Sequence, residues 1–199
     1  MEPSAASYPA TFTVDPAEKV TNWRPLVNWL MAIPHLIVLY ALGILVEVIA
    51  VISWFQILFT GSMSDTFANL QAMCLRYQQR TYTFVAFMHE DYPPFGFATT
   101  SADDGLDPHT RVDVQPSLTD RDRLSVGLRI FYVIPHLIAL VGLAIYAYIL
   151  VIINLFIVLF KGEWNPGHRD TVVKVMRWAV RVQAYFCLLT DEYPPFSLD

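Results

Sequence analysis

Two histidines in apolar surroundings are the residues of this sequence best suited to bind a ligand. His35 and His136 occupy the same place in two copies of the pattern Ile-Pro-His-Leu-Ile, 101 positions apart (136 − 35). Paired helix histidines can ligate a haem or chlorophyll-type ring. A histidine beside a proline can also hydrogen-bond near the start of a kinked helix, and we favour this structural role. We therefore expect no cofactor, and His35 and His136 are the candidates if one is present.

Charged side chains inside apolar segments form the second group of candidates. Glu47 is the one acidic residue of a long apolar run, where a carboxylate needs a partner. Arginines four residues apart lie on one face of a predicted helix in each half of the chain, Arg76 with Arg80 and Arg177 with Arg181. We expect Glu47 to pair with Arg76 or Arg80; a protonated acid or ion translocation are the alternatives. The arginine pairs suit lipid phosphate, or they set the depth of the helix in the membrane.

A second repeated motif, Tyr-Pro-Pro-Phe, stands at positions 92–95 and 193–196. Two prolines do not continue a helix, and aromatic residues favour the membrane–water interface, so the motif is typical of a helix exit. Its aromatic residues are also candidates for contact with a partner protein: Tyr92, Phe95, Tyr193 and Phe196. The sequence has no nucleophile–base arrangement, HExxH, paired CxxC or phosphate-binding glycine loop. We expect no catalytic residue and no metal site, and we predict that the protein is not an enzyme.

An internal repeat places all of these motifs. The pattern Phe-x-x-Leu-Phe-x-Gly also recurs, at 55–61 and 156–162, and the arginine pairs keep the same offset without insertion or deletion. We divide the chain into repeat 1 (residues 11–97), a linker (98–110) and repeat 2 (111–199).

The composition places this repeat in a membrane. Of the 199 residues, 55% are hydrophobic and 16% are charged, whereas soluble domains carry about 25% charged residues. Residues 130–160 contain no Asp, Glu, Lys or Arg, and residues 25–60 contain only Glu47. Both runs exceed the roughly 20 apolar residues that cross a bilayer. We predict an all-α integral membrane protein built of two tandem pseudo-symmetric repeats. The net charge of −5 argues against a nucleic-acid partner.

Each repeat is predicted to contain the same elements. Alternating residues at 11–14 and 111–114 are typical of minor strands, which we expect to pair across the repeats. Residues 15–18 have the cap, proline and glutamate of a helix start. An interfacial helix up to about residue 33 and a proline kink then precede a transmembrane helix at 34–59. A second membrane or amphipathic helix follows, predicted at 67–88 in repeat 1 and at 171–189 in repeat 2.

The second helix leaves two topologies open. If it spans the membrane, each repeat is a membrane hairpin, the protein has four spans and the copies are parallel. If it lies in the interface, the copies are inverted, with one span each. Apolar and aromatic residues on both sides of the arginines favour the hairpin. The distribution of Lys and Arg then makes this a multi-pass protein of the cell membrane with its termini and linker in the cytoplasm.

These motifs together resemble a known family. The Ile-Pro-His-Leu-Ile pattern, the segment Ile57-Leu58-Phe59-Thr60-Gly61, the spaced arginines and the final Tyr-Pro-Pro-Phe are similar to a prokaryotic membrane family, domain of unknown function 4389, in both repeats. The repeats differ from each other at Glu47, where repeat 2 has Tyr148, and at His89, where repeat 2 has Thr190. The resemblance implies a two-repeat membrane protein and supplies no catalytic residue.

The absence of reactive groups and the abundance of aromatic residues on apolar helices favour a role in assembly. We expect a non-catalytic accessory or scaffold subunit whose partners are membrane lipids and a larger membrane protein complex. The alternative is a small channel or transporter for lipid, ion or small solute, with its site at the repeat interface. A polar cavity reached by Glu47 and the arginines would favour transport, and a dry, packed centre would favour the scaffold.

Overall fold

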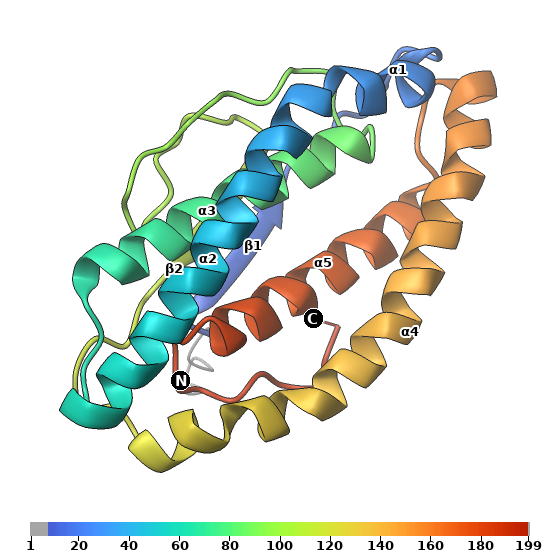
Figure 1. Ribbon diagram of the computed structural model, residues 1–199. Coiled ribbons are helices and arrows are strands. Elements are labelled where there is room, and N and C mark those ends of the chain that lie inside the picture. The colour runs from blue at the N-terminus through green and yellow to red at the C-terminus, as the bar shows by residue number, and fades with distance from the viewer. Residues whose placement is uncertain (1–7, 199) are drawn as a thin grey trace, which may run out of the picture.

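The computed structural model describes residues 8–198. Its elements are β1 (Ala10–Val14), α1 (Arg24–Met31), α2 (Ile33–Thr60), α3 (Asp65–Val85), β2 (Thr110–Val114), α4 (Arg123–Lys161) and α5 (Pro166–Phe186) (Figure 1). The fold is mostly helical, with one long apolar helix in each repeat and a small two-stranded sheet, which confirms the predicted two-repeat architecture.

The long helices begin differently in the two repeats and end alike. In repeat 1 a one-residue break separates α1 from α2, which begins next to Pro34 as predicted. In repeat 2 helix α4 runs unbroken through Pro135, so the expected separate interfacial helix is wrong there. A proline removes one intrahelical hydrogen bond, but α4 is fixed upstream, where the Asp122 carboxylate accepts hydrogen bonds from two first-turn amides. Both long helices end at a glycine with φ of 72°, Gly61 and Gly162.

The segment after β1 is irregular, although its sequence suggests a helix start. Its backbone amides donate to distant parts of the chain, Ala17 to the Met88 carbonyl at 2.9 Å and Val20 to the Gly162 carbonyl at 2.8 Å. The helix predicted from residues 15–18 does not form, because these long-range hydrogen bonds hold the backbone extended between β1 and α1.

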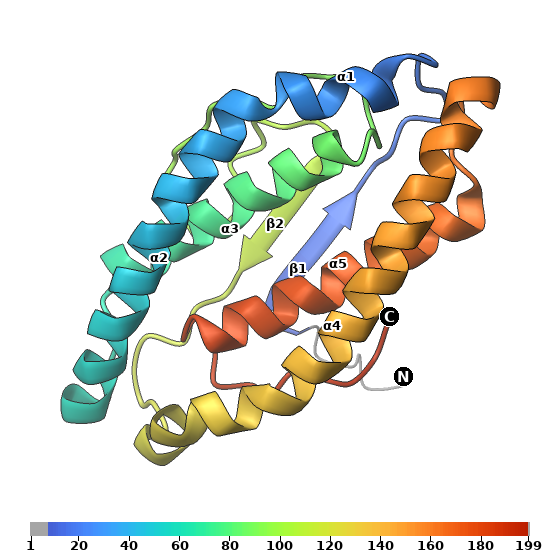
Figure 2. The same cartoon turned by 45° about the vertical axis from the view of Figure 1, so that its right-hand side comes forward.

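The elements form three layers (Figure 1, Figure 2). The outer layer consists of α1, α2 and α4, the middle layer of α3 and α5, and the third layer of β1 and β2. Helix α2 packs on α3, and α4 packs on α5. The strands cross over: β1 of repeat 1 packs on α5 of repeat 2, and β2 of repeat 2 packs on α3 of repeat 1. The strands therefore tie the two repeats to each other.

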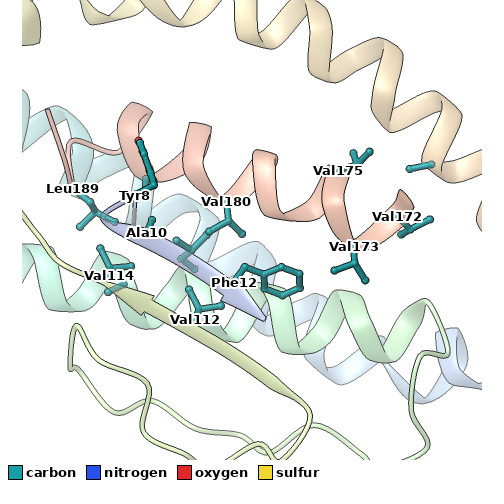
Figure 3. Packing of buried hydrophobic residues seen from close by; sticks show 14 of the residues in the cluster. Tyr8, Ala10, Phe12, Val112, Val114, Val172, Val173, Val175, Val180 and Leu189 are labelled. Carbon is teal, nitrogen blue, oxygen red and sulfur yellow. The ribbon is translucent and has the colours of Figure 1, made fainter. Parts of the chain in front are cut away.

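The strands pair antiparallel with Phe12 opposite Val112, which confirms the predicted pairing across the repeats. Both side chains are buried, and their neighbours along each strand point outward, so one face of the sheet lies on the middle layer. Figure 3 shows this core, in which Val173 and Val180 of α5 point toward the strands while Val175 points away from them; Val172 belongs to the same cluster. Each such apolar side chain contributes roughly 1.5–3 kcal/mol through burial.

The two repeats are inverted relative to each other. The end of α2 meets the start of α4, where the Arg121 amide donates to the Gly61 carbonyl at 3.0 Å. The end of α4 meets the segment before α1, where the Val20 amide donates to the Gly162 carbonyl. Helices α2 and α4 therefore run antiparallel (Figure 2). If both crossed a membrane, the two copies would have opposite orientations, unlike the parallel copies expected for two hairpins.

Two helices within residues 8–198 are long and apolar enough to cross a membrane, α2 and α4. Helices α3 and α5 do not meet that standard, because their polar and charged residues continue along their whole length. The predicted linker (98–110), which connects repeat 1 to β2, packs against α3 through hydrogen bonds to Arg76 and ion pairs with Arg80, so it is not a free spacer. The predicted location of the termini concerns residues 1–7 and 199, which lie outside the described part of the chain.

Candidate functional site

The two repeated motifs of repeat 1 meet around His35. This histidine is buried at the start of α2, with Nδ1 2.6 Å from the Tyr77 hydroxyl. The Phe95 ring stacks on the imidazole at 4.2 Å between centroids, and the Tyr92 ring lies at 4.8 Å. The Tyr92 hydroxyl donates to the Met31 carbonyl at 3.2 Å. The Tyr-Pro-Pro-Phe segment thus folds back on the proline-bearing start of α2.

Repeat 2 builds the same arrangement around His136. Phe196 stacks on the imidazole at 3.9 Å, and Tyr193 lies at 4.8 Å. The Tyr193 hydroxyl donates to the Tyr132 carbonyl at 3.2 Å, the counterpart of the contact in repeat 1. Each histidine is enclosed by the exit motif of its own repeat, and binding of a shared ligand by His35 and His136 stays a hypothesis. Their enclosure supports the structural role.

The candidate partner-contact residues keep one face outward. Tyr92 and Phe95 are 41% and 50% exposed, and Tyr193 and Phe196 are 44% and 57% exposed, although each also packs on a histidine. Contact of these rings with a partner stays a prediction.

The arginines of α3 bind the linker. Arg76 is buried, and its guanidinium donates to the Thr100 carbonyl at 2.8 Å and the Ala102 carbonyl at 2.6 Å. Arg80 is equally buried and forms ion pairs with Asp103 and Asp104. Burial alone raises the pKa of Asp104, but hydrogen bonds from Arg80 and a backbone amide outweigh it, so the pKa lies below its usual value.

Glu47 does not pair with Arg76 or Arg80, which corrects the sequence prediction. Its side chain is exposed and makes no ion pair within residues 8–198. The arginines point to the opposite side of α3, where aspartates 103 and 104 already neutralise them. Glu47 instead borders a cavity of about 370 Å³ between α2, α3 and α5, lined by Leu39, Leu42, Gly43, Val46, Glu47, Cys74, Gln78, Tyr82, Gln183, Phe186 and Cys187.

The arginines of α5 have different surroundings. Arg177 is half-buried and donates from Nε to the Phe12 carbonyl at 3.3 Å. Arg181 is engaged, with Nη1 3.5 Å from the Ser197 hydroxyl among its contacts. The repeated arginine pair therefore binds the linker in repeat 1, whereas in repeat 2 Arg177 binds β1 and Arg181 contacts Ser197 in the segment after α5.

A second ion-pair cluster was missed by the sequence analysis. The Asp191 carboxylate accepts hydrogen bonds from Arg121 at 2.6 and 2.7 Å and from Arg129 at 2.5 Å, and both arginines are buried. Arg129 also donates to the Tyr185 carbonyl at 3.0 Å. A usable signal was present, because an acidic residue precedes Tyr-Pro-Pro-Phe in both repeats, and Arg129 directly precedes the charge-free run.

A histidine pair joins the linker to the end of repeat 1. His89 and His109 stack at 4.6 Å, and His109 Nε2 lies 2.7 Å from the Asp91 carboxylate. Burial lowers the pKa of His109, but the hydrogen bond to Asp91 outweighs it and the pKa is raised. Burial lowers the pKa of His89. Within the described residues, no group of three or more His, Cys, Asp or Glu side chains is arranged to hold a metal ion.

The outer layer exposes a broad apolar face. Only four side chains of the 28-residue α2 are buried: His35, Ile49, Ser53 and Ile57. Phe59 and Phe160, near the ends of α2 and α4, are 78% and 83% exposed. Other exposed apolar side chains of the two helices include Ile37, Tyr40, Ile44, Val48, Val51, Phe55, Phe131, Ile138, Val141, Ile145, Ile152 and Phe156. We define α2 and α4 with these side chains as the apolar face. Soluble monomers rarely expose so extended an apolar surface.

The fold and these surfaces define a class of protein: two inverted helical repeats, tied by a two-stranded sheet and apolar on one side. Residues 22–96 and 123–197 each match the family described as a domain of unknown function, DUF4389. The two matches cover most of the chain, so the protein belongs to this family, in two tandem copies. Both strands and the linker lie outside the matched ranges. Searches of curated proteins and of solved structures gave no match.

Proposed function

We propose that the protein is a non-catalytic scaffold of the cell membrane, held by its apolar face and presenting its strand layer to water. The observation that carries this proposal is the one-sided distribution of the apolar surface. Lipid is the solvent that suits helices whose side chains are apolar around most of their circumference.

The layers favour insertion from one side over a four-span arrangement. Helix α3 packs on the inner side of α2, and the linker packs on the far side of α3, where it contacts the buried arginines Arg76 and Arg80. If α2 stood across the bilayer, Asp103 and Asp104 would lie at membrane depth beside it. A charged residue at the bilayer centre costs about 2.5–3.5 kcal/mol on insertion scales. With α2 and α4 resting in the membrane surface, the ion pairs stay on the water side.

The edge of the apolar face suits this orientation. Trp23, the residue before α1, and Trp29 within α1 are 50% and 56% exposed, and Arg24 lies against the Trp23 ring. Tryptophan and basic residues gather at the boundary between hydrocarbon and water. The Lys and Arg bias of the sequence then favours the cytoplasmic side for the linker and the sheet.

Cysteine labelling tests the orientation. Glu18 precedes α1 and Thr119 lies near the end of α2, so the two positions bracket the long helix, and both are exposed. In sealed vesicles, an impermeant thiol reagent should label E18C and T119C from the same side. The wild-type chain is the control, because its Cys74 and Cys187 are buried. Labelling from opposite sides would show that α2 crosses the membrane and would overturn one-sided insertion.

Co-purification tests the scaffold role. Purification of the intact chain in mild detergent should retain a membrane complex, and Tyr92→Ala combined with Tyr193→Ala should release it while the helical content stays unchanged. Isolation of the wild-type chain alone from native membranes would argue against a scaffold.

The cavity beside Glu47 supports a second candidate, a small channel or transporter. It lies at the repeat interface, where a hydrogen bond of 2.8 Å joins Gln183 to Gln78. No arginine lines it, however, so it lacks half of the polar pathway expected from the sequence. Uptake into proteoliposomes that Glu47→Gln abolishes would favour transport over the scaffold.

A further inference from the structure

The two outer edges of the small sheet differ in whether a neighbouring segment hydrogen-bonds to their backbone amides. At β2 the linker closes the edge: the Val112 amide donates to the Asp103 carboxylate at 3.0 Å, and the Val114 amide donates to the Ser101 carbonyl at 3.0 Å. The same stretch of linker binds Arg76 and Arg80 of α3. A looped acidic segment thus satisfies a strand edge and a buried arginine pair together.

The outer edge of β1 has no such cover within residues 8–198. In an antiparallel pair, alternate residues turn their amides away from the partner strand. Because Phe12 lies opposite Val112, whose amide faces the linker, the amides of Phe12 and Val14 also point outward. Neither amide has a hydrogen-bond acceptor among the described residues. Open strand edges are sites at which another chain can pair.

Positive charge lies beside this open edge. Arg177 uses Nε to hold the Phe12 carbonyl, and its two Nη groups make no hydrogen bond with the described residues. Arg169, two turns earlier on α5, makes one long hydrogen bond of 3.4 Å to the Ala17 carbonyl. The two arginines border a cleft of about 260 Å³ at the end of β1, lined by Val14, Pro16, Pro166, Arg169, Asp170, Val173 and Arg177.

We propose that the open edge of β1 binds an extended acidic segment of a partner protein. The segment adds a strand beside β1 by backbone hydrogen bonds, and its carboxylates bind Arg177 and Arg169. The linker of this chain shows the chemistry that fits, since Asp103 and Asp104 combine an edge contact with arginine pairing. The inference rests on the proposed scaffold function, because it names how a partner is held, and it places that contact in the strand layer away from the apolar face.

A peptide with the linker sequence is the probe. A fluorescent peptide of residues 96–107 is titrated into the full-length protein in detergent, and binding is followed by fluorescence anisotropy. The protein's own linker keeps the α3 site, because its tether holds it there at a millimolar effective concentration. We expect saturable binding, and exchange protection of the Phe12 and Val14 amides when the peptide is bound.

Charge variants locate the site. A peptide carrying Asp103→Asn and Asp104→Asn should bind at least about tenfold more weakly, and so should the wild-type peptide to the Arg177→Gln protein, because charged hydrogen bonds are lost. Arg177→Lys should recover part of the affinity. Lys174→Gln is the matched control, since Lys174 lies one turn away on α5 and forms a surface ion pair with Asp170, its one ion pair among residues 8–198, and this variant should bind like wild type.

Three outcomes would overturn the proposal: no binding, binding that Arg177→Gln leaves intact, or binding that excess inorganic phosphate abolishes without protection of the two amides. The last result would identify a simple anion site. The assay needs no membrane, so peptide binding together with cysteine labelling from opposite sides would refute the membrane orientation alone.

Discussion

Replacing Asp103 by alanine tests whether the linker belongs to the folded core. Its carboxylate is 5% exposed and lies 3.4 Å from Arg76 Nε and 3.3 Å from Arg80 Nη2. It also accepts hydrogen bonds from the amides of Val112 and Gly105, at 3.0 and 2.8 Å. The substitution leaves two buried guanidinium groups with one carboxylate fewer and an edge amide without its acceptor.

The expected loss of stability follows from that inventory. Removing one partner of a buried ion pair costs about 3–5 kcal/mol. Asp104 remains beside Arg80, so we expect the lower end, about 3 kcal/mol. For a chain of this size, each kcal/mol shifts Tm by about 2–4 °C, giving a decrease of roughly 6–12 °C. Asp103→Asn keeps an oxygen acceptor and loses only the charge, so it should cost less, about 1–2 kcal/mol.

Thermal unfolding of the detergent-solubilised chain, followed by circular dichroism, measures the effect. Asp170→Ala is the control, because that carboxylate is 62% exposed and forms an ion pair one helical turn from Lys174; it should cost at most about 0.5 kcal/mol. Hydrogen exchange should show that Asp103→Ala opens the linker and α3 together. If Asp103→Ala is no less stable than Asp170→Ala, the linker is not part of the core and our account of the buried arginines is wrong.

Three other measurements test the remaining clusters. Burial raises the pKa of Asp191, but hydrogen bonds from its arginines outweigh this effect and hold the pKa below its usual value. The stability that the charged carboxylate contributes is present above about pH 3.9 and is lost as pH falls through the pKa of the folded state. Tm should therefore fall more steeply in acid for the wild type than for Asp191→Asn, and equal slopes would contradict this role of Asp191. The raised pKa of His109 gives stability that is complete below about pH 6.5 and lost as pH rises through the folded value; His109→Gln should remove this slope, and an unchanged slope would assign it elsewhere. Tyr193→Phe should cost about 1 kcal/mol for one hydrogen bond and His136→Ala about 3 kcal/mol for a buried ring; the reverse order in Tm would refute the enclosed-histidine interpretation.

Local patterns predicted much of the fold. The apolar runs, the glycine ends and the proline at residue 34 located α2 and the end of α4 within a few residues, and the alternating segments located both strands. These signals depend only on residues that are close together in the sequence, so a single sequence is sufficient to detect them. The unbroken passage of α4 through Pro135 was not predictable in the same way, because it depends on an upstream cap and on packing against α5.

The partners of the buried charges were not predictable, because they lie far apart in sequence. Glu47 and the arginines of α3 occur in apolar stretches of the sequence. We paired them because an ion pair lowers the free-energy cost of placing a charge in hydrocarbon. The structure satisfies Arg76 and Arg80 with the linker, which the sequence analysis had assigned only as the connection between the two repeats. Helix periodicity placed the arginines on one face of α3. It could not identify the chain segment that covers that face.

Differences between the repeats separate what the fold requires from what one copy adds. Asn28 and Arg129 occupy corresponding positions. Asn28 donates to the Phe84 carbonyl near the end of α3 at 2.9 Å, and Arg129 donates to the Tyr185 carbonyl near the end of α5 at 3.0 Å. Different side chains thus supply one structural hydrogen bond, so the exchange does not alter the fold. The outer edges of the two strands, in contrast, differ between the repeats. The linker hydrogen-bonds to the edge of β2, and no comparable segment covers β1 among the described residues. Within residues 8–198 the two edges therefore differ, and under the proposal made above the edge of β1 is the side on which an extended partner pairs.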